Sequence, residues 1–103
     1  MIFAERSEIE LTIGRAILDR RLVRIEHRMR SRLLEPWALG YGARGDLVLQ
    51  AWRRDADEDG WLLIPLVDIR RVEALDERVG ARRPALLDGQ RRMPRLLVQM
   101  IER

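Results

Sequence analysis

The chain has 103 residues, 47% hydrophobic and 36% charged, a balance typical of one soluble globular domain with a modest core. Cysteine is absent, which excludes disulfides and thiolate chemistry. No apolar run reaches the roughly 20 residues of a membrane span, and no signal peptide is visible, so a cytoplasmic location is expected. All 20 basic residues are arginine, against 17 acidic residues. GC-rich codon usage explains this bias simply, yet any basic surface built from arginine is competent to hold phosphate.

A helix is predicted over about residues 8–19. Ser7 and Glu10 have the spacing of a capping box, which satisfies backbone N–H groups at the start of a helix. An apolar stripe at helical spacing predicts the buried face, formed by Ile9, Ile13, Ala16 and Ile17. Leu11 and Leu18 lie on the opposite side, so the helix either packs against a second body through them or leaves them exposed.

Short strands are predicted after the helix. From Leu22 apolar residues alternate with charged ones, which is typical of a half-buried strand, and His27 falls on its inward-facing side. A tight turn is expected near Arg30 and Ser31, and Pro36 is expected at a strand end because it lacks a backbone N–H. Five strands are predicted, at about residues 22–29, 33–37, 47–52, 61–66 and 69–75. This spacing predicts a mainly β fold, a small five-stranded antiparallel barrel whose closure removes exposed sheet edges.

The pattern changes toward the end of the chain. Residues 79–84 contain glycine, arginine and proline and predict a linker. Pro94 suits the first turn of a short C-terminal helix over about residues 94–102. The apolar face of that helix is formed by Leu96, Leu97, Met100 and Ile101. The sequence thus predicts a folded unit over residues 1–78, followed by a linker and a short helix over residues 79–103.

Few residues of the chain are suited to catalysis. It has one histidine, His27, two serines and one threonine, and none has a base and an orienting partner in the sequence. His27 is therefore expected to be a hydrogen-bonded residue of the core or of a pocket. Residues 55–60 repeat the start of a calcium-binding loop, but Leu66 stands where a glutamate is needed, so a solvated acidic loop is predicted. No enzymatic activity, metal site or cofactor is expected.

Several stretches of the chain resemble the WYL domain, a family of ligand-sensing modules in bacterial regulators. Ala16-Ile17 matches a pair near the end of the family's first helix. The stretch from Val23 to His27 resembles its first strand, with histidine where the family usually has tyrosine. Leu34-Glu35-Pro36 matches the end of the next strand, and Ala51-Trp52 and the stretch from Ile64 to Ile69 correspond to later motifs.

The resemblance covers about residues 14–77. It implies an Sm-like or SH3-like barrel and a regulatory role connected with nucleic acid or nucleotide-like ligands. Together with the arginine-rich strands, it predicts a non-enzymatic regulatory module that binds nucleic acid or a small anionic ligand. The predicted ligand contacts are His27, Arg24, Arg28, Trp37, Arg70 and Arg71.

Other positions favour a different function. The triplet that names the family aligns with Leu47-Val48-Leu49, where only the leucine remains, and two arginines of its last motif are replaced by Pro65 and Asp68. The alternative is a protein-interaction or oligomerisation module with a degenerate ligand site, either a homodimer or a module with a helix-mediated partner. The tryptophans and Tyr41 could stack on bases, but packing in or around the core is the simpler interpretation.

Overall fold

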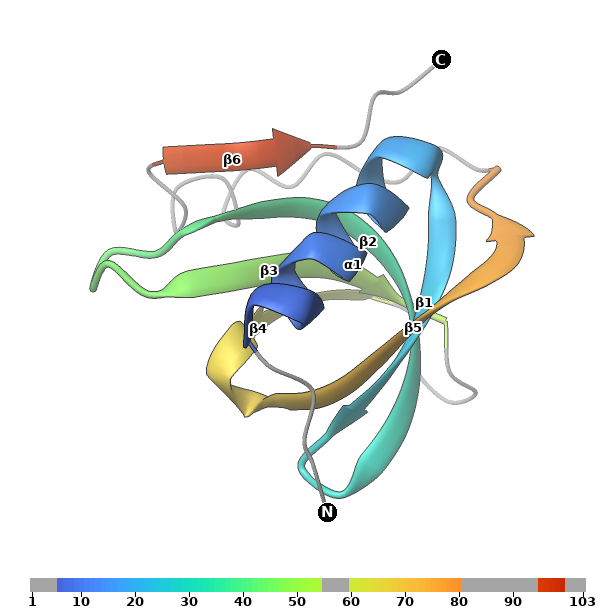
Figure 1. Cartoon of the computed structure of the whole chain (residues 1–103), viewed down its shortest axis with the longest axis horizontal. Coiled ribbons are helices and arrows are strands. Elements are labelled where there is room, and N and C mark those ends of the chain that lie inside the picture. Colours follow the sequence, from blue (N-terminus) through green and yellow to red (C-terminus); the bar gives the residue numbers. More distant parts are fainter. Residues whose placement is uncertain (1–5, 55–59, 81–94, 100–103) are drawn as a thin grey trace.

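The computed structural model describes residues 6–54, 60–80 and 95–99. The fold is mainly β, with one helix at its N-terminal end (Figure 1). In chain order the elements are α1 (Arg6–Asp19), β1 (Arg21–His27), β2 (Arg30–Tyr41), β3 (Leu47–Arg53), β4 (Gly60–Pro65), the 3-10 turn η1 (Leu66–Asp68), β5 (Ile69–Arg78) and β6 (Arg95–Gln99). The predicted helix and five strands are thus present, with shifted ends.

Five strands form an antiparallel sheet in the order β4-β3-β2-β1-β5, and β6 adds to β2. The predicted barrel closure is not found in the described residues, because the edge strands β4 and β5 pair only with β3 and β1. The two edges are instead joined through η1, where Leu66 and the following Ile69 are buried in the core. Strands β4 and β5 are therefore held together by the chain through η1 and by side-chain packing, and not by ladder hydrogen bonds between them.

Helix α1 lies across the strands (Figure 1). Its predicted apolar stripe is confirmed, since the stripe is buried in the main core, which also contains residues of every strand from β1 to β5. Leu11 and Leu18 are 55% and 64% exposed, so the structure leaves these two leucines on the outer side of the helix. The helix begins at Arg6, which places the predicted cap Ser7 inside its first turn.

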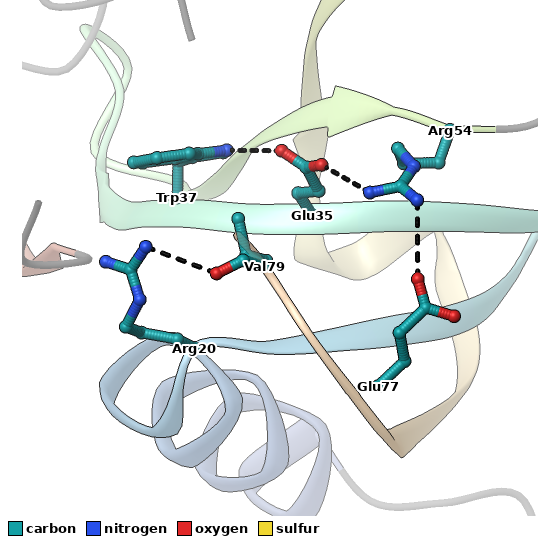
Figure 2. A network of polar contacts seen from close by, with 6 residues as sticks. All are labelled: Arg20, Glu35, Trp37, Arg54, Glu77 and Val79. Atoms are coloured by element: carbon teal, nitrogen blue, oxygen red, sulfur yellow. Dashed lines mark hydrogen bonds and ion pairs between the residues drawn. The ribbon is translucent and has the colours of Figure 1, made fainter. Parts of the chain in front are cut away.

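The corner between α1 and β1 is tied to the end of β5. Arg20 adopts a positive φ of 58° just after the helix. Its backbone carbonyl accepts a hydrogen bond from the N–H of Val79 at 2.6 Å, and its guanidinium donates to the Val79 carbonyl at 3.2 Å (Figure 2). Arg78 donates to the Asp19 carbonyl at 2.6 Å. The bonds accepted by the Asp19 and Arg20 carbonyls satisfy groups that the end of a helix leaves without partners.

The turn between β1 and β2 lies two residues earlier than predicted. Arg28 and Met29 form it, with φ values of 50° and 63°, and the ladder resumes with His27 opposite Arg30. Positive φ at both central residues gives a two-residue hairpin the right twist for the strands on either side. Arg30 and Ser31, the predicted turn, therefore belong to β2.

Strand β2 continues well beyond the predicted end at Trp37. Pro36 lies inside it rather than at its end, and the ladder with β3 shifts register between Pro36 and Ala38. A bulge of this kind accommodates a residue without an N–H, because the regular hydrogen-bond pattern is already interrupted there.

The predicted C-terminal helix is not confirmed, and strand β6 occupies residues 95–99 of its range. Residues 95–99 pair antiparallel with β2 from Ala38 to Tyr41, while the rest of the predicted helix lies outside the described residues. Strand β1 pairs with β2 only from Arg30 to Leu34, so the second half of β2 offers an open edge on that side. A helix of about nine residues is marginal on its own, whereas a strand on an open edge gains ladder hydrogen bonds.

Candidate functional site

Basic side chains gather where β1 turns into β2. Val23, Ile25 and His27 alternate on the buried face of β1. In the antiparallel register Ile25 lies opposite Arg32 and His27 lies opposite Arg30, so both arginines share the inner face of the sheet with the histidine. Cross-strand neighbours of this kind have Cβ atoms about 5 Å apart. We call His27, Arg28, Arg30, Arg32 and Asp68 the hairpin site.

His27 is the buried centre of the hairpin site. The residue is only 8% exposed, and within the described residues its Nδ1 atom is covered and has no hydrogen-bond partner. Burial, together with Arg32 and Arg28, holds the pKa of His27 below its ordinary value of 6.5, while Asp68 acts in the opposite direction. The imidazole is therefore neutral at neutral pH, in a basic environment.

Two of the predicted contacts lie on the outer face of the sheet, Arg24 on β1 and Arg71 on β5. Arg24 is exposed and donates to the Ser31 hydroxyl at 3.5 Å. Arg71 lies opposite Glu26 in the ladder, with 3.8 Å between its Nε and a carboxylate oxygen. A ligand that touches His27 from the inner face therefore meets these two arginines only by reaching around the sheet.

Arg28 and Arg70 lie closer to the histidine. Arg28 is exposed in the turn directly after His27. Arg70 is exposed at the start of β5, where the pairing of Ile69 with His27 is followed by a shift in register. Together with Arg30 and Arg32 they surround one end of β1 with guanidinium groups.

Trp37 does not belong to this cluster. It lies seven residues after Arg30 on β2, which corresponds to roughly 20 Å along a strand. There it is buried and donates from Nε1 to Oε1 of Glu35 at 3.1 Å (Figure 2). Five of the six predicted contacts therefore lie around the hairpin end, and Trp37 belongs to a different part of the sheet.

Glu35 organises the polar contacts around Trp37. Its side chain is completely buried, and its Oε2 accepts from Arg54 at 2.8 Å. Arg54 also donates to Glu77 of β5 at 3.3 Å, so one guanidinium links β2 with the end of β5 (Figure 2). We call Glu35, Trp37, Arg54 and Glu77 the Glu35 network. Both carboxylate oxygens of Glu35 are engaged in it, which fits a structural role.

The three tryptophans pack on one another. Trp61 makes edge-to-face contacts with Trp37 at a centroid separation of 6.0 Å and with Trp52 at 5.2 Å. All three belong to or border the main hydrophobic core. The simpler interpretation, packing in or around the core, is confirmed for them, because ring edges and faces are used within the molecule.

Arg30, Arg32 and Asp68 are not among the ligand contacts predicted from the sequence. The position of the two arginines beside His27 follows from the register of β1 and β2, and this register depends on where the turn lies. The predicted turn at Arg30 and Ser31 leaves Arg30 outside both strands, and it places neither Arg30 opposite His27 nor Arg32 opposite Ile25. Asp68 came to attention only as a departure from the family pattern, yet η1 places it where its charge acts on His27.

The described residues hold no group of three or more His, Cys, Asp or Glu side chains that could bind a metal ion. The predicted acidic loop, residues 55–59, lies outside them. None of the helical structure described is long and apolar enough to cross a membrane.

Comparisons with protein-family models, with curated proteins and with solved structures gave no match. The resemblance to WYL domains therefore stays a prediction.

Proposed function

We propose that this protein is a non-enzymatic regulatory module that binds a phosphate-bearing ligand at the hairpin site. The single observation that carries the proposal is the cluster of exposed and half-buried arginines around the buried His27. Residues 24–32 contain four arginines and one carboxylate, which gives this end of the molecule a local positive charge. Guanidinium groups keep their charge and present forked donors that match phosphate oxygens.

The finer fold assignment is part of this proposal. We infer that the open sheet has the connectivity of an Sm-like or SH3-like fold. The leading helix, the strand order and the 3-10 turn between β4 and β5 support it. The resemblance to WYL domains supports a role in ligand sensing and transcription regulation. A cytoplasmic location belongs to the same proposal, and the lack of cysteine is compatible with it.

Oligonucleotide titrations at several salt concentrations test the proposal. Short single-stranded and duplex DNA, RNA and a free nucleoside triphosphate serve as separate probes, so that a nucleic acid can be told from a small ligand. Binding should weaken steeply as salt rises, because phosphate binding releases counterions. The absence of binding to all four probes at low salt would rule the proposal out.

A pair of variants locates the site. Replacing Arg28 and Arg30 together by glutamine should weaken binding at least ~10-fold at low salt and reduce the salt slope by about 0.7–0.9 for each phosphate that is no longer neutralised. The matched control is Arg44→Gln, since Arg44 is exposed in the turn at the other end of β2. Equally weakened binding in the double variant and the control would show that binding does not use the hairpin site.

A second candidate function is an interaction module that works through α1. Leu11 and Leu18 are exposed and lie two helical turns apart on one side of the helix. Light scattering of the protein and of a Leu11→Glu, Leu18→Glu variant tests this candidate for self-association. A dimer that becomes monomeric in the variant would support it. If the wild type and the variant are both monomeric, a homodimer through this face of α1 is excluded.

A further inference from the structure

His27 is buried in surroundings that disfavour its charged form. Its Nδ1 has no partner in the described residues, and its ladder partners are Arg30 on β2 and Ile69 on β5. The charged groups around it are Arg28 in the turn, Arg30 and Arg32 on β2, Asp68 in η1, Arg70 and Arg71 on β5, and Glu26 on β1. The Arg71–Glu26 pair lies on the outer face. Among these groups, the carboxylate of Asp68 acts on His27 in the direction opposite to Arg28 and Arg32.

We infer that phosphate binding at the hairpin site is coupled to protonation of His27, so that affinity for a phosphodiester ligand rises as pH falls. The inference rests on the proposed function, since it concerns how the same site is regulated. A phosphate held between Arg28, Arg30 and Arg32 brings negative charge next to the imidazole. That charge offsets the repulsion from the arginines and favours the imidazolium.

Thermodynamic linkage makes the coupling reciprocal. If the anion makes His27 easier to protonate, then protonated His27 must bind the anion more tightly by the same factor. Each unit by which the ligand raises the pKa of His27 corresponds to about a tenfold gain in affinity between high and low pH. The ligand must not titrate in the same range, so a phosphodiester is a better probe than a phosphate monoester, whose second pKa is about 6.

Nuclear magnetic resonance provides a direct test, because His27 is the only histidine of the chain. The ring protons of untagged protein, titrated between about pH 5 and 8, report one imidazole pKa. We expect a pKa below 6.5 for the free protein and a higher one in the presence of a thymidine oligonucleotide, whose bases do not titrate in this range. A pKa that stays constant or falls when the oligonucleotide is bound would overturn the inference.

A variant separates the inference from the proposed function. His27→Gln stays neutral at all pH values, so the ratio of its affinities at about pH 5.5 and pH 8 should be close to one, whatever its affinity at pH 8, whereas the wild type should bind more tightly at the lower pH. Binding by the wild type with the same pH dependence in His27→Gln would overturn the proton coupling and leave the proposed function standing. No binding by the wild type at any pH would overturn both. If His27→Gln does not fold, the titration of the wild type decides alone.

Discussion

Glu35 places a carboxylate at a point of the sheet that water does not reach. Burying a charge is costly unless it is paired and hydrogen-bonded, and Trp37 and Arg54 supply those partners. Arg54 itself is about one-third exposed, with 34% of its side chain accessible. The carboxylate is therefore the member of the pair that depends on its partner.

Replacing Arg54 by alanine should destabilise the fold by about 3–5 kcal/mol, because it leaves the buried Glu35 carboxylate without its charged partner. The measurement is the free energy of unfolding from urea denaturation. Glu77→Ala is the matched control: Glu77 binds the same arginine, but its side chain is 60% exposed, so its removal should cost at most about 1 kcal/mol. Similar costs for the two variants would contradict a special role for the buried carboxylate.

His27 should make stability depend on pH even without a ligand. In the unfolded chain the imidazole takes up a proton near pH 6.5, whereas the lowered pKa in the folded state delays uptake to lower pH. Between the two values the unfolded state binds more protons, so the free energy of unfolding falls as pH falls through this window. Urea midpoints at about pH 7.5 and 5.5 should show this decrease in the wild type and a smaller one in His27→Gln. Equal decreases would show that other groups cause it.

At the scale of elements, the β1–β2 hairpin combines an unfavourable turn with an exposed apolar tip. Arg28 and Met29 both adopt positive φ, which costs residues with a Cβ about 1–2 kcal/mol each. Met29 is 87% exposed, so its side chain gains little from packing in return. The cross-strand pairs of β1 and β2 must therefore hold the turn in place.

Met29→Gly should raise the free energy of unfolding by about 0.5–1 kcal/mol, because glycine adopts positive φ without strain but loses more chain entropy on folding. Ser31→Gly is the matched control, since Ser31 lies in β2 and a glycine inside a strand costs about as much as the first change gains. Thermal or urea unfolding of the two variants decides whether the turn lies at Arg28 and Met29 or at the predicted Arg30 and Ser31. Stabilisation by Ser31→Gly and not by Met29→Gly would favour the turn predicted from the sequence.

Elements with an unbroken local pattern could be predicted from the sequence. The apolar stripe of α1 and the period-two pattern of β1 lie within single segments, and both predictions are confirmed. The turn at Arg28 and Met29 lacks the usual Asn-Gly signal, since the chain has no asparagine. Strand β6 depends on an open edge of β2 more than fifty residues away, and no local pattern reports such an edge.

For the candidate site, too, only the features that depend on a single segment could be predicted from the sequence. The inward register of His27 follows from alternation within β1 and is confirmed. The neighbours of His27 come from β2 and η1, so their identity depends on strand register, which a one-residue error inverts. Trp37 was predicted to lie near His27, whereas β2 places it seven residues after Arg30, the ladder partner of His27.

At the scale of the whole molecule, β2 is the strand that connects the parts. It pairs with β1 over its first half, with β6 over its second half, and with β3 along most of its length. The hairpin site lies at one end of β2 and β6 at the other. Strand β6 can therefore take its place only after β2 is part of the sheet, because it pairs with the second half of that strand.

Val98→Pro tests this arrangement. Val98 lies opposite Leu39, and proline removes a backbone N–H from β6. We expect faster hydrogen exchange at those amides between Ala38 and Tyr41 that face β6, because the edge is no longer covered. Val98→Ala keeps the backbone N–H and should leave the exchange unchanged. Unchanged exchange in Val98→Pro would argue against the strand and in favour of the predicted helix.

The bulge in β2 also determines how the chain tolerates changes in length. Leu34 and Leu39 are five residues apart, yet both are buried in the same core, because the extra residue in the bulge reverses the order of inward and outward positions. Deleting one residue at Trp37 would restore regular alternation and turn Leu39 outward. A one-residue insertion or deletion in the exposed turn at Ala43 and Arg44, by contrast, leaves the facing of β2 untouched. Variation in length among natural relatives of this protein should therefore fall in that turn and avoid the bulge.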